Sequence, residues 1–387
     1  MEMADTMQVT VSPHLHRRDE TISRGMRNVL VALAPLGIWA IIIFGFNVVY
    51  ILAVSCITAA LSEIVMRKIM RRPVTLSDGS AMVTAILFAF LLAPTTPLWV
   101  VAIGSFIAVV IAKELFGGLG KNIFNPAIFA RVVLFFSPLA VYSQRYARPF
   151  FWKTTGFFSP VATSINNNVS SGVVYKTLAG NSTSLVTAAT PLSLFKSGRL
   201  LPGIVTGPTP VGSTWVTSSG RPNVGGLFLG LKSGTIGEIS ILLILLGGLY
   251  LIYKGTVDWR IPAGIIGAFF LLTLVTWYHP VDNLFGGGLF LGAFFMATDW
   301  VTSPVTRRGK WIFAIGIGVT IFILRFWSAR PEGVALAIII WNPLTLLIDR
   351  YIAQPRFGEV TNPLFSKLPI LPKSKPVPAA KSAPEKT

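Results

Sequence analysis

The sequence has little charge, few acidic residues and almost no cysteine or histidine. Only 12% of its 387 residues are charged and 52% are hydrophobic, whereas an ordinary soluble domain has roughly 25% charge. Cys56 is the single cysteine, which excludes an internal disulfide, a four-cysteine iron–sulfur cluster and a thiolate zinc site. Of the three histidines only His279 lies near an apolar run, which excludes bis-histidine haem. We expect no metal site.

Acidic residues are scarce relative to basic ones, with 15 Asp and Glu against 33 Lys and Arg and a net charge of +18. Such a balance is typical of nucleic-acid binding when the charge lies on one face of a soluble domain. Here the basic residues lie between apolar runs. An excess of Lys and Arg in the short loops of one membrane face explains them better. The sequence predicts a lipid environment and no nucleic-acid partner.

Apolar runs bounded by helix breakers predict about ten membrane spans. We expect them at residues 29–46, 48–66, 80–93, 98–115, 126–143, 238–253, 261–277, 284–298, 311–327 and 333–352. The chain then divides into five segments. Residues 1–28 form a cytoplasmic N-terminal segment, residues 29–143 the first five spans, and residues 144–237 an extramembrane segment rich in Ser, Thr, Gly, Pro and Asn. Residues 238–352 form the second five spans, and residues 353–387 a mostly disordered tail rich in Pro, Ala and Lys.

The distribution of basic residues predicts the orientation. With a cytoplasmic N-terminus, 23 of the 33 Lys and Arg residues, Arg131 among them, fall on the cytoplasmic side. The short outer loops hold two, Arg325 and Arg330, and residues 144–237 hold eight. Long loops cross regardless of charge, so the short loops decide. We expect both termini in the cytoplasm, residues 144–237 outside, and Arg325 snorkelling to the interface.

The two groups of five spans share features that indicate an internal repeat. The third and eighth spans are the shortest, each begins near an acidic residue and glycine, and each ends on Ala, Thr and Pro. Each half also has a later Asn-Pro pair, at Asn125-Pro126 and Asn342-Pro343. An odd number of spans per repeat requires the second copy to be inverted, and short interrupted spans in matching halves point to a central site. The alternative is that the two halves have similar helix-ending residues by convergence, without a repeat.

Carboxylates at the depth of the spans support a site within the bundle. A charged side chain at the bilayer centre costs about 2.5–3.5 kcal/mol on insertion scales, so such groups usually face the interior or a cavity. The chain has six within or at the ends of apolar runs: Glu63, Asp78, Glu114, Asp282, Asp299 and Asp349. For any one of them a helix-end role is the alternative. Our candidates for an ion path or bundle site are Asp78, Asn125, Asp282, Asp299 and Asn342.

Two motifs carry the remaining chemical signal. In the outer segment, Thr187-Ala188-Ala189-Thr190-Pro191 reads as a helix start, with Thr190 as N-cap and proline at the first helical position. A helix N-terminus also favours phosphate, so Thr190 could hold a phosphate group non-covalently or as an ester. The second motif, GGLGKNIFNPA at residues 117–127, reads as a glycine-rich helix end followed by a proline-started helix.

Together these motifs resemble the RnfD family of the Rnf complex, and more broadly the family shared with the B-type component of the sodium-translocating NADH:quinone oxidoreductase. The resemblance covers residues 12–355. It implies an all-α integral membrane protein of the prokaryotic cytoplasmic membrane, with ten helices in two inverted five-helix repeats, similar to urea transporters, and one long external loop. It also implies electron relay between ferredoxin and NAD, coupled to Na+ or H+ translocation, together with the other membrane and peripheral Rnf subunits.

The resemblance further implies FMN joined by a phosphoester to Thr190, placed there by a flavin transferase, next to Thr187, Ala188, Ala189 and Pro191. A second, non-covalent flavin, riboflavin in relatives, is implied within the bundle, and no catalytic side chain is assigned. The chain departs from the family pattern at Thr187-Ala188, where Ser-Gly is commoner, and at Ser184, where an acidic residue is common. Two other functions stay open: the B-type component of the quinone-reducing sodium pump, and a flavin-free solute channel or carrier on the same scaffold.

Overall fold

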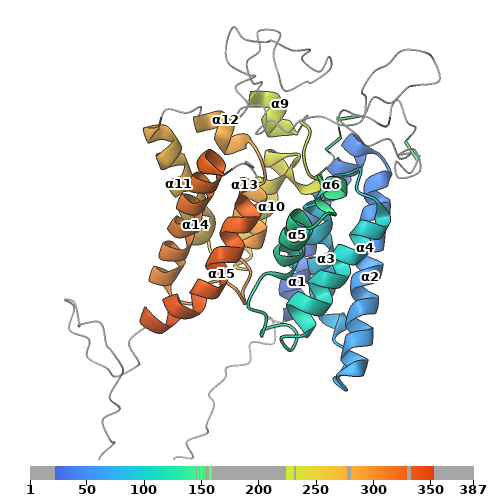
Figure 1. The fold of residues 1–387 in the computed structure, drawn as a ribbon. Coiled ribbons are helices and arrows are strands. Elements are labelled where there is room, and N and C mark those ends of the chain that lie inside the picture. Colours follow the sequence, from blue (N-terminus) through green and yellow to red (C-terminus); the bar gives the residue numbers. More distant parts are fainter. Residues whose placement is uncertain are drawn as a thin grey trace, which may run out of the picture.

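The computed structural model describes residues 22–144, 146–147, 149–150, 152, 157–158, 224–230, 232–276, 280–328 and 333–352 (Figure 1). All elements in these ranges are helices. Four are long and apolar enough to cross a membrane: α1 (Ile22–Phe44), α2 (Asn47–Ile69), α14 (Arg307–Trp327) and α15 (Val334–Tyr351). Four shorter apolar helices accompany them: α3 (Ser80–Phe90), α5 (Pro126–Phe136), α10 (Ile241–Tyr253) and α11 (Arg260–Val275). The described part of the chain is therefore all-helical and has the long apolar helices of a membrane protein, while the number of spans stays a prediction.

The other elements are short, and several interrupt the spans. α4 (Leu98–Phe106) continues directly into a π-helix, η2 (Ile107–Glu114), and α13 (Leu289–Leu291) continues into a second π-helix, η5 (Gly292–Met296). π-helical turns occur frequently at functional sites. The remaining short elements are η1 (Leu76–Asp78), α6 (Ala140–Ser143), α9 (Val224–Leu229), η4 (Ile236–Glu238) and α12 (Pro280–Phe285).

The span expected at residues 126–143 is broken in the structure. α5 ends at Phe136, and Ser137 has an extended backbone with φ −90° and ψ 165°. The next residue, Pro138, disfavours a helical conformation in the residue before it. The chain resumes as the four-residue α6. The hydrophobic run continues across a residue pair that ends the helix, so α5 covers only the first part of the expected range.

The helices form two groups, α1–α6 and α10–α15, which lie beside each other in Figure 1. In the first group α2 packs on α3 and α4, and in the second α11 packs on α14. The groups meet where α1 packs on α10 and α5 packs on α15. These contacts join elements at corresponding positions of the two halves, which is what a two-fold relation predicts. The inverted repeat itself stays a prediction.

The chain just before α10 packs into the bundle. The Ile236 backbone N–H donates to the Leu92 carbonyl at 3.0 Å. A Cβ on Gly237 would lie 2.6 Å from Phe90 Cβ and 2.9 Å from Leu291 Cδ2. Glycine therefore lets η4 fit between the end of α3 and α13, the third and eighth predicted spans. Most of the predicted outer segment, including residues 187–191, lies outside the described residues.

A polar cluster joins the beginnings of α11 and α14. Asp258 accepts hydrogen bonds from Lys310 Nζ at 2.9 Å and from Arg260 Nη1 at 3.1 Å. Partial burial alone raises the pKa of the Asp258 carboxyl, but these hydrogen bonds and the two positive charges lower that pKa below its ordinary value. The pairing fixes the loop between α10 and α11 against the start of α14.

Two arginines differ from their predicted placement. Arg325 is 4% exposed, and its guanidinium donates to the carbonyls of Asn283 and Gly286 at the end of α12. The snorkelling prediction was wrong because the interrupted helix supplies backbone acceptors inside the bundle. Arg131 lies within α5 and contacts Ser143 at 3.4 Å, so it does not belong to a cytoplasmic loop. Removing it from the charge count, together with Arg67 of α2 and Lys113 of η2, which are also buried within helices, leaves the predicted orientation unchanged.

Candidate functional site

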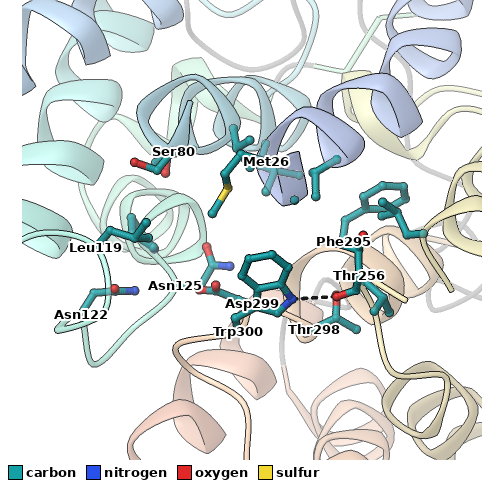
Figure 2. Close-up of a pocket in the computed structure, with 18 of the residues that line it drawn as sticks. Met26, Ser80, Leu119, Asn122, Asn125, Thr256, Phe295, Thr298, Asp299 and Trp300 are labelled. Atoms are coloured by element: carbon teal, nitrogen blue, oxygen red, sulfur yellow. Dashed lines mark hydrogen bonds between the residues drawn. The ribbon is translucent and has the colours of Figure 1, made fainter. Parts of the chain in front are cut away.

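A cavity lies between the two groups of helices (Figure 2). Its volume is about 80 Å³, enough for several waters, each of which needs roughly 10–15 Å³ on this measure. With its opening to solvent the empty space is about 750 Å³. The walls come from α1, α3, η2, the loop before α5 and the start of α5, the end of α10 and its following loop, and η5 with the loop after it. Both halves of the chain therefore build this cavity.

Asn125 fixes the position where the two halves meet beside the cavity. Its side-chain oxygen caps α5 by accepting from the backbone N–H groups of Ala127 at 3.1 Å and Ile128 at 3.4 Å. Its Nδ2 donates to the Met296 carbonyl of η5 at 3.2 Å. The cap that the Asn-Pro pair predicts is therefore present, and the same amide also ties α5 to the second half.

The second Asn-Pro pair lies against the first. The Asn342 side-chain oxygen accepts from the Asn125 backbone N–H at 3.0 Å, and its NH2 group donates to the Ile338 carbonyl at 3.1 Å. Pro343 lies inside α15, so this pair does not begin a helix as Asn125-Pro126 does. The two pairs that suggested a repeat thus meet at the interface of the halves.

Asn122 lines the cavity and has a buried acceptor without a partner among the described residues. It is 5% exposed, and it lies in the same loop as Asn125. Its Nδ2 donates to the Phe124 carbonyl at 3.1 Å, while its Oδ1 is buried and has no hydrogen-bond partner among the described residues. Leaving a buried acceptor unpaired costs about 1–3 kcal/mol. An N–H group of a ligand that reached this oxygen would satisfy it.

Trp300 covers one side of the cavity. Its Nε1 donates to the Thr256 carbonyl at 2.7 Å, the dashed line in Figure 2. A Cβ on Gly25 of α1 would collide with the indole ring, so the ring crosses from the second half onto α1. Asp299 also lines the cavity, and its oxygens accept from the Val301 N–H and the Thr302 hydroxyl at 3.5 and 3.4 Å.

A buried cluster of four charges lies behind the wall formed by α3. It consists of two residues of α2 and two of η2, each no more than 7% exposed: Glu63, Arg67, Lys113 and Glu114. Lys113 Nζ lies 2.9 Å from Glu63 Oε2, and Arg67 Nε lies 3.2 Å from Glu114 Oε2. The two positive and two negative charges balance. Buried charges usually require such pairing.

One member of the cluster reaches the cavity wall. Lys113 and Ser80 both line the cavity, and Lys113 Nζ donates to Ser80 Oγ at 2.7 Å. Ser80 Oγ in turn donates to Asp78 Oδ1 at 2.6 Å, and the Ser80 backbone N–H donates to the same oxygen at 2.7 Å. Asp78 thus interacts with the start of α3, which is the helix-end role given above as the alternative, and it connects to the cavity through Ser80.

The glycine-rich motif packs against the buried charge cluster. Gly117 and Gly118 have φ of 116° and 92°, a region that side chains with a Cβ rarely adopt. A Cβ on Gly118 would lie 2.7 Å from Arg67 Nη2. The motif does end a helix, but its glycines also let the backbone pass close to the buried guanidinium.

The structure brings together part of the predicted site. Asn125 and Asp299 line the cavity, Asn342 contacts Asn125, and Asp78 connects through Ser80. Asp282 lies in α12, and its side chain is outside the described part of the chain. Sequence reasoning missed Asn122, Lys113 and Trp300. Two sequence features could have indicated them: Asn122 is an amide within the GGLGKNIFNPA motif, and Lys113 belongs to a Lys-Glu pair that ends an apolar run.

Comparison with known proteins gives one family over most of the chain. Residues 8–358 match the model of the NQR2, RnfD, RnfE family. The chain is 36% identical to the D-type component of the proton-translocating ferredoxin:NAD(+) oxidoreductase complex of Clostridium ljungdahlii, covering 90% of this chain and 96% of that protein. It is 35% identical to the D-type component of the Na(+)-translocating ferredoxin:NAD(+) oxidoreductase complex of Acetobacterium woodii, covering 91% and 95%. A third relative, the D-type component of the ion-translocating oxidoreductase complex of Stutzerimonas stutzeri, is 36% identical over 87% and 92%.

Proposed function

The chain belongs to the NQR2, RnfD, RnfE family, and we propose on this basis that it is the D-type component of an ion-translocating ferredoxin:NAD+ oxidoreductase complex. The observation that carries the proposal is the near-full-length similarity to relatives that are named as this component. The chain has one cysteine, so the iron–sulfur centres of a ferredoxin pathway belong to other subunits. These relatives favour the ferredoxin-linked complex over the quinone-reducing one.

The coupling ion stays either Na+ or H+ in this proposal. One relative is named as proton-translocating and another as Na+-translocating, with 36% and 35% identity to this chain. Similarity of this degree therefore does not select the ion. The carboxylates beside the cavity, Asp78 and Asp299, fit either one.

We propose that the protein has ten spans in two inverted repeats, lies in the prokaryotic cytoplasmic membrane and has both termini in the cytoplasm. The packing of α1 on α10 and of α5 on α15 supports the repeat. Exposed apolar side chains on α2, namely Ile57, Leu61 and Val65, recur at the spacing of one helix face and suit contact with lipid or a neighbouring protein of the complex.

The orientation predicts the result of a topology experiment. A reporter fused near Asn181 should report the external side, and one fused after Lys375 should report the cytoplasm. The physical reason is the excess of Lys and Arg in the short loops of one face. Enzymatic reporters that are active on only one side of the membrane measure this directly. The same side for both positions would contradict the number of spans.

We propose two flavins for this chain: FMN esterified to Thr190 and a second, non-covalent flavin in the cavity. The described residues fit the second. The cavity has apolar walls from residues such as Val83, Leu87 and Phe294, and it has a few polar groups, as ligand sites usually do. The unpaired oxygen of Asn122 suits the ring N–H of a flavin. Because the cavity volume is about 80 Å³, smaller than a typical ligand pocket, the bound molecule would also occupy the space that opens to solvent.

When bound, a flavin supplies one- and two-electron transfer that the side chains here cannot perform. The residues of this chain would then hold and shield it. Asn122 would accept its N–H, while Asn125 keeps the loop attached to η5. Phe294 and Phe295 would exclude water from one side of the cavity, and Trp300 would close it against α1.

Replacing Asn122 by leucine tests the cavity flavin. Leucine has a similar size but no acceptor, so affinity should fall by the cost of the lost hydrogen bond, about 1–3 kcal/mol or roughly 5- to 150-fold. The measurement is the flavin released on denaturing the purified complex, per mole of this chain. Asn47→Leu is the matched control, since Asn47 is also buried and bonds to the Pro94 carbonyl away from the cavity. A wild-type complex without releasable flavin, or an Asn122→Leu complex with full affinity, would refute this assignment.

A further inference from the structure

Lys113 brings a buried positive charge to the wall of the cavity. Its side chain is 2% exposed, and Lys113 is among the lining residues together with Ser80. Its principal counter-ion, Glu63, is not among the lining residues. The ammonium group hydrogen-bonds to Ser80, a second lining residue, at 2.7 Å, and the carboxylate that balances it belongs to α2 and does not line the cavity.

The ammonium group has bonding capacity left for a ligand. A lysine has three N–H donors. Glu63 Oε2 at 2.9 Å and Ser80 Oγ at 2.7 Å accept two of them. Glu114 Oε1 lies 4.0 Å away, beyond hydrogen-bonding distance. Within the described part of the chain, the third donor has no acceptor.

The other charged group in the wall is already engaged. Asp299 accepts from the Val301 N–H and the Thr302 hydroxyl, and a carboxylate would repel a negatively charged ligand. Arg67, the second cation of the cluster, pairs with Glu114 and donates to the Pro73 carbonyl at 2.9 Å. Lys113 is thus the cation of the described cavity wall that can bind an anion.

We propose that Lys113 binds the reduced form of the cavity flavin and stabilises its negative charge. This inference rests on the proposed second flavin. A flavin that takes two electrons from the reduced ferredoxin side of the complex and one proton from water carries one net negative charge. A charge-assisted hydrogen bond from an ammonium group favours that form over the neutral oxidised form, and the low local dielectric strengthens the preference. Lys113 therefore raises the midpoint potential of the flavin, and Glu63 moderates the effect by sharing the ammonium group.

The test is a spectroelectrochemical titration of the purified complex. The titration uses a Thr190→Ala background, which removes any covalent flavin from this chain. The cavity flavin is then the only flavin of this chain that contributes to the signal. The informative variant is Lys113→Gln combined with Glu63→Gln, because removing both charges keeps the cluster neutral and limits damage to the fold. We expect the double substitution to weaken the binding of reduced flavin at least tenfold more than the binding of oxidised flavin. This ratio corresponds to a midpoint potential lower by about 30 mV for two electrons.

Two controls separate charge from structure. Lys113→Arg keeps a cation at the wall and should hold the potential near the wild-type value. Lys68→Gln removes one positive charge from an exposed position next to Arg67 on α2 and should leave the potential unchanged. A double variant whose potential is unchanged, or which binds both flavin forms with equally reduced affinity, would overturn the role of Lys113 while the flavin site stands. A wild-type complex without non-covalent flavin would overturn both proposals.

Discussion

Replacing Thr190 by alanine is expected to abolish covalent flavin on this chain while the protein still inserts into the membrane. A phosphoester needs the threonine hydroxyl, and alanine has none. Loss of the helix cap that the sequence predicts at Thr190 would cost only about 1 kcal/mol, too little to prevent folding. A helix N-terminus stabilises a negative group by about 0.3–1 kcal/mol, which is consistent with a phosphate placed just before Pro191. The measurement is flavin fluorescence of the denatured chain in a gel.

The matched control is the neighbouring threonine. Thr187→Ala should retain the label, and a mass shift on the peptide that contains both threonines locates the modified hydroxyl. An alcohol oxygen is a poor nucleophile without activation, so the wild-type chain must be produced together with its flavin transferase. A wild-type chain that stays unlabelled under these conditions would contradict covalent flavinylation and favour the flavin-free channel.

The sequence predicts the long spans well because the bilayer leaves few alternatives. A segment in hydrocarbon must satisfy its backbone groups internally, so a long apolar run becomes a helix. α1, α2, α14 and α15 follow from this requirement. Helix caps can also be predicted from the local sequence. An asparagine followed by proline predicts the start of α5, and the Asn125 side chain does cap that helix. Each prediction depends only on neighbouring residues.

Contacts between distant residues could not be predicted in this way. A charged side chain within an apolar run can snorkel to the interface or find a partner inside, and the local sequence is the same in both cases. Arg325 is buried because carbonyls about 40 positions earlier, at Asn283 and Gly286, accept its hydrogen bonds. Lys113 pairs with Glu63, 50 positions earlier. Both outcomes depend on helix packing.

The cavity illustrates the same limit. Asn125 and Asp299 were candidates because an amide and a carboxylate stand out in apolar surroundings, and both line the cavity. Asn122 lies in the recognised motif, yet only the fold reveals that its oxygen is buried without a partner. The role of Gly118 likewise depends on Arg67, which comes from a different helix.

Removing the positive charge of Arg67 is expected to destabilise the protein strongly. Arg67→Met leaves Glu63 and Glu114 with Lys113 as the only cation of the cluster, so one buried negative charge loses its compensation. Breaking a buried ion pair in this way costs about 3–5 kcal/mol. Thermal unfolding of the detergent-solubilised protein should show a clear loss of stability. Lys68→Met, at an exposed position on the same helix, should change stability by no more than about 0.5 kcal/mol.

A second substitution should restore most of that loss. In Arg67→Met with Glu114→Gln, the remaining Lys113 and Glu63 still pair at 2.9 Å, and the cluster is neutral again. Replacing a whole buried ion pair is often neutral or even stabilising, whereas removing one partner is not. The double variant should therefore be more stable than Arg67→Met alone, with a coupling free energy at the upper end of about 0.5–3 kcal/mol. Equal stability of the two variants would mean that Arg67 contributes through its contact with the Pro73 carbonyl and its packing, and that charge balance does not hold the cluster together.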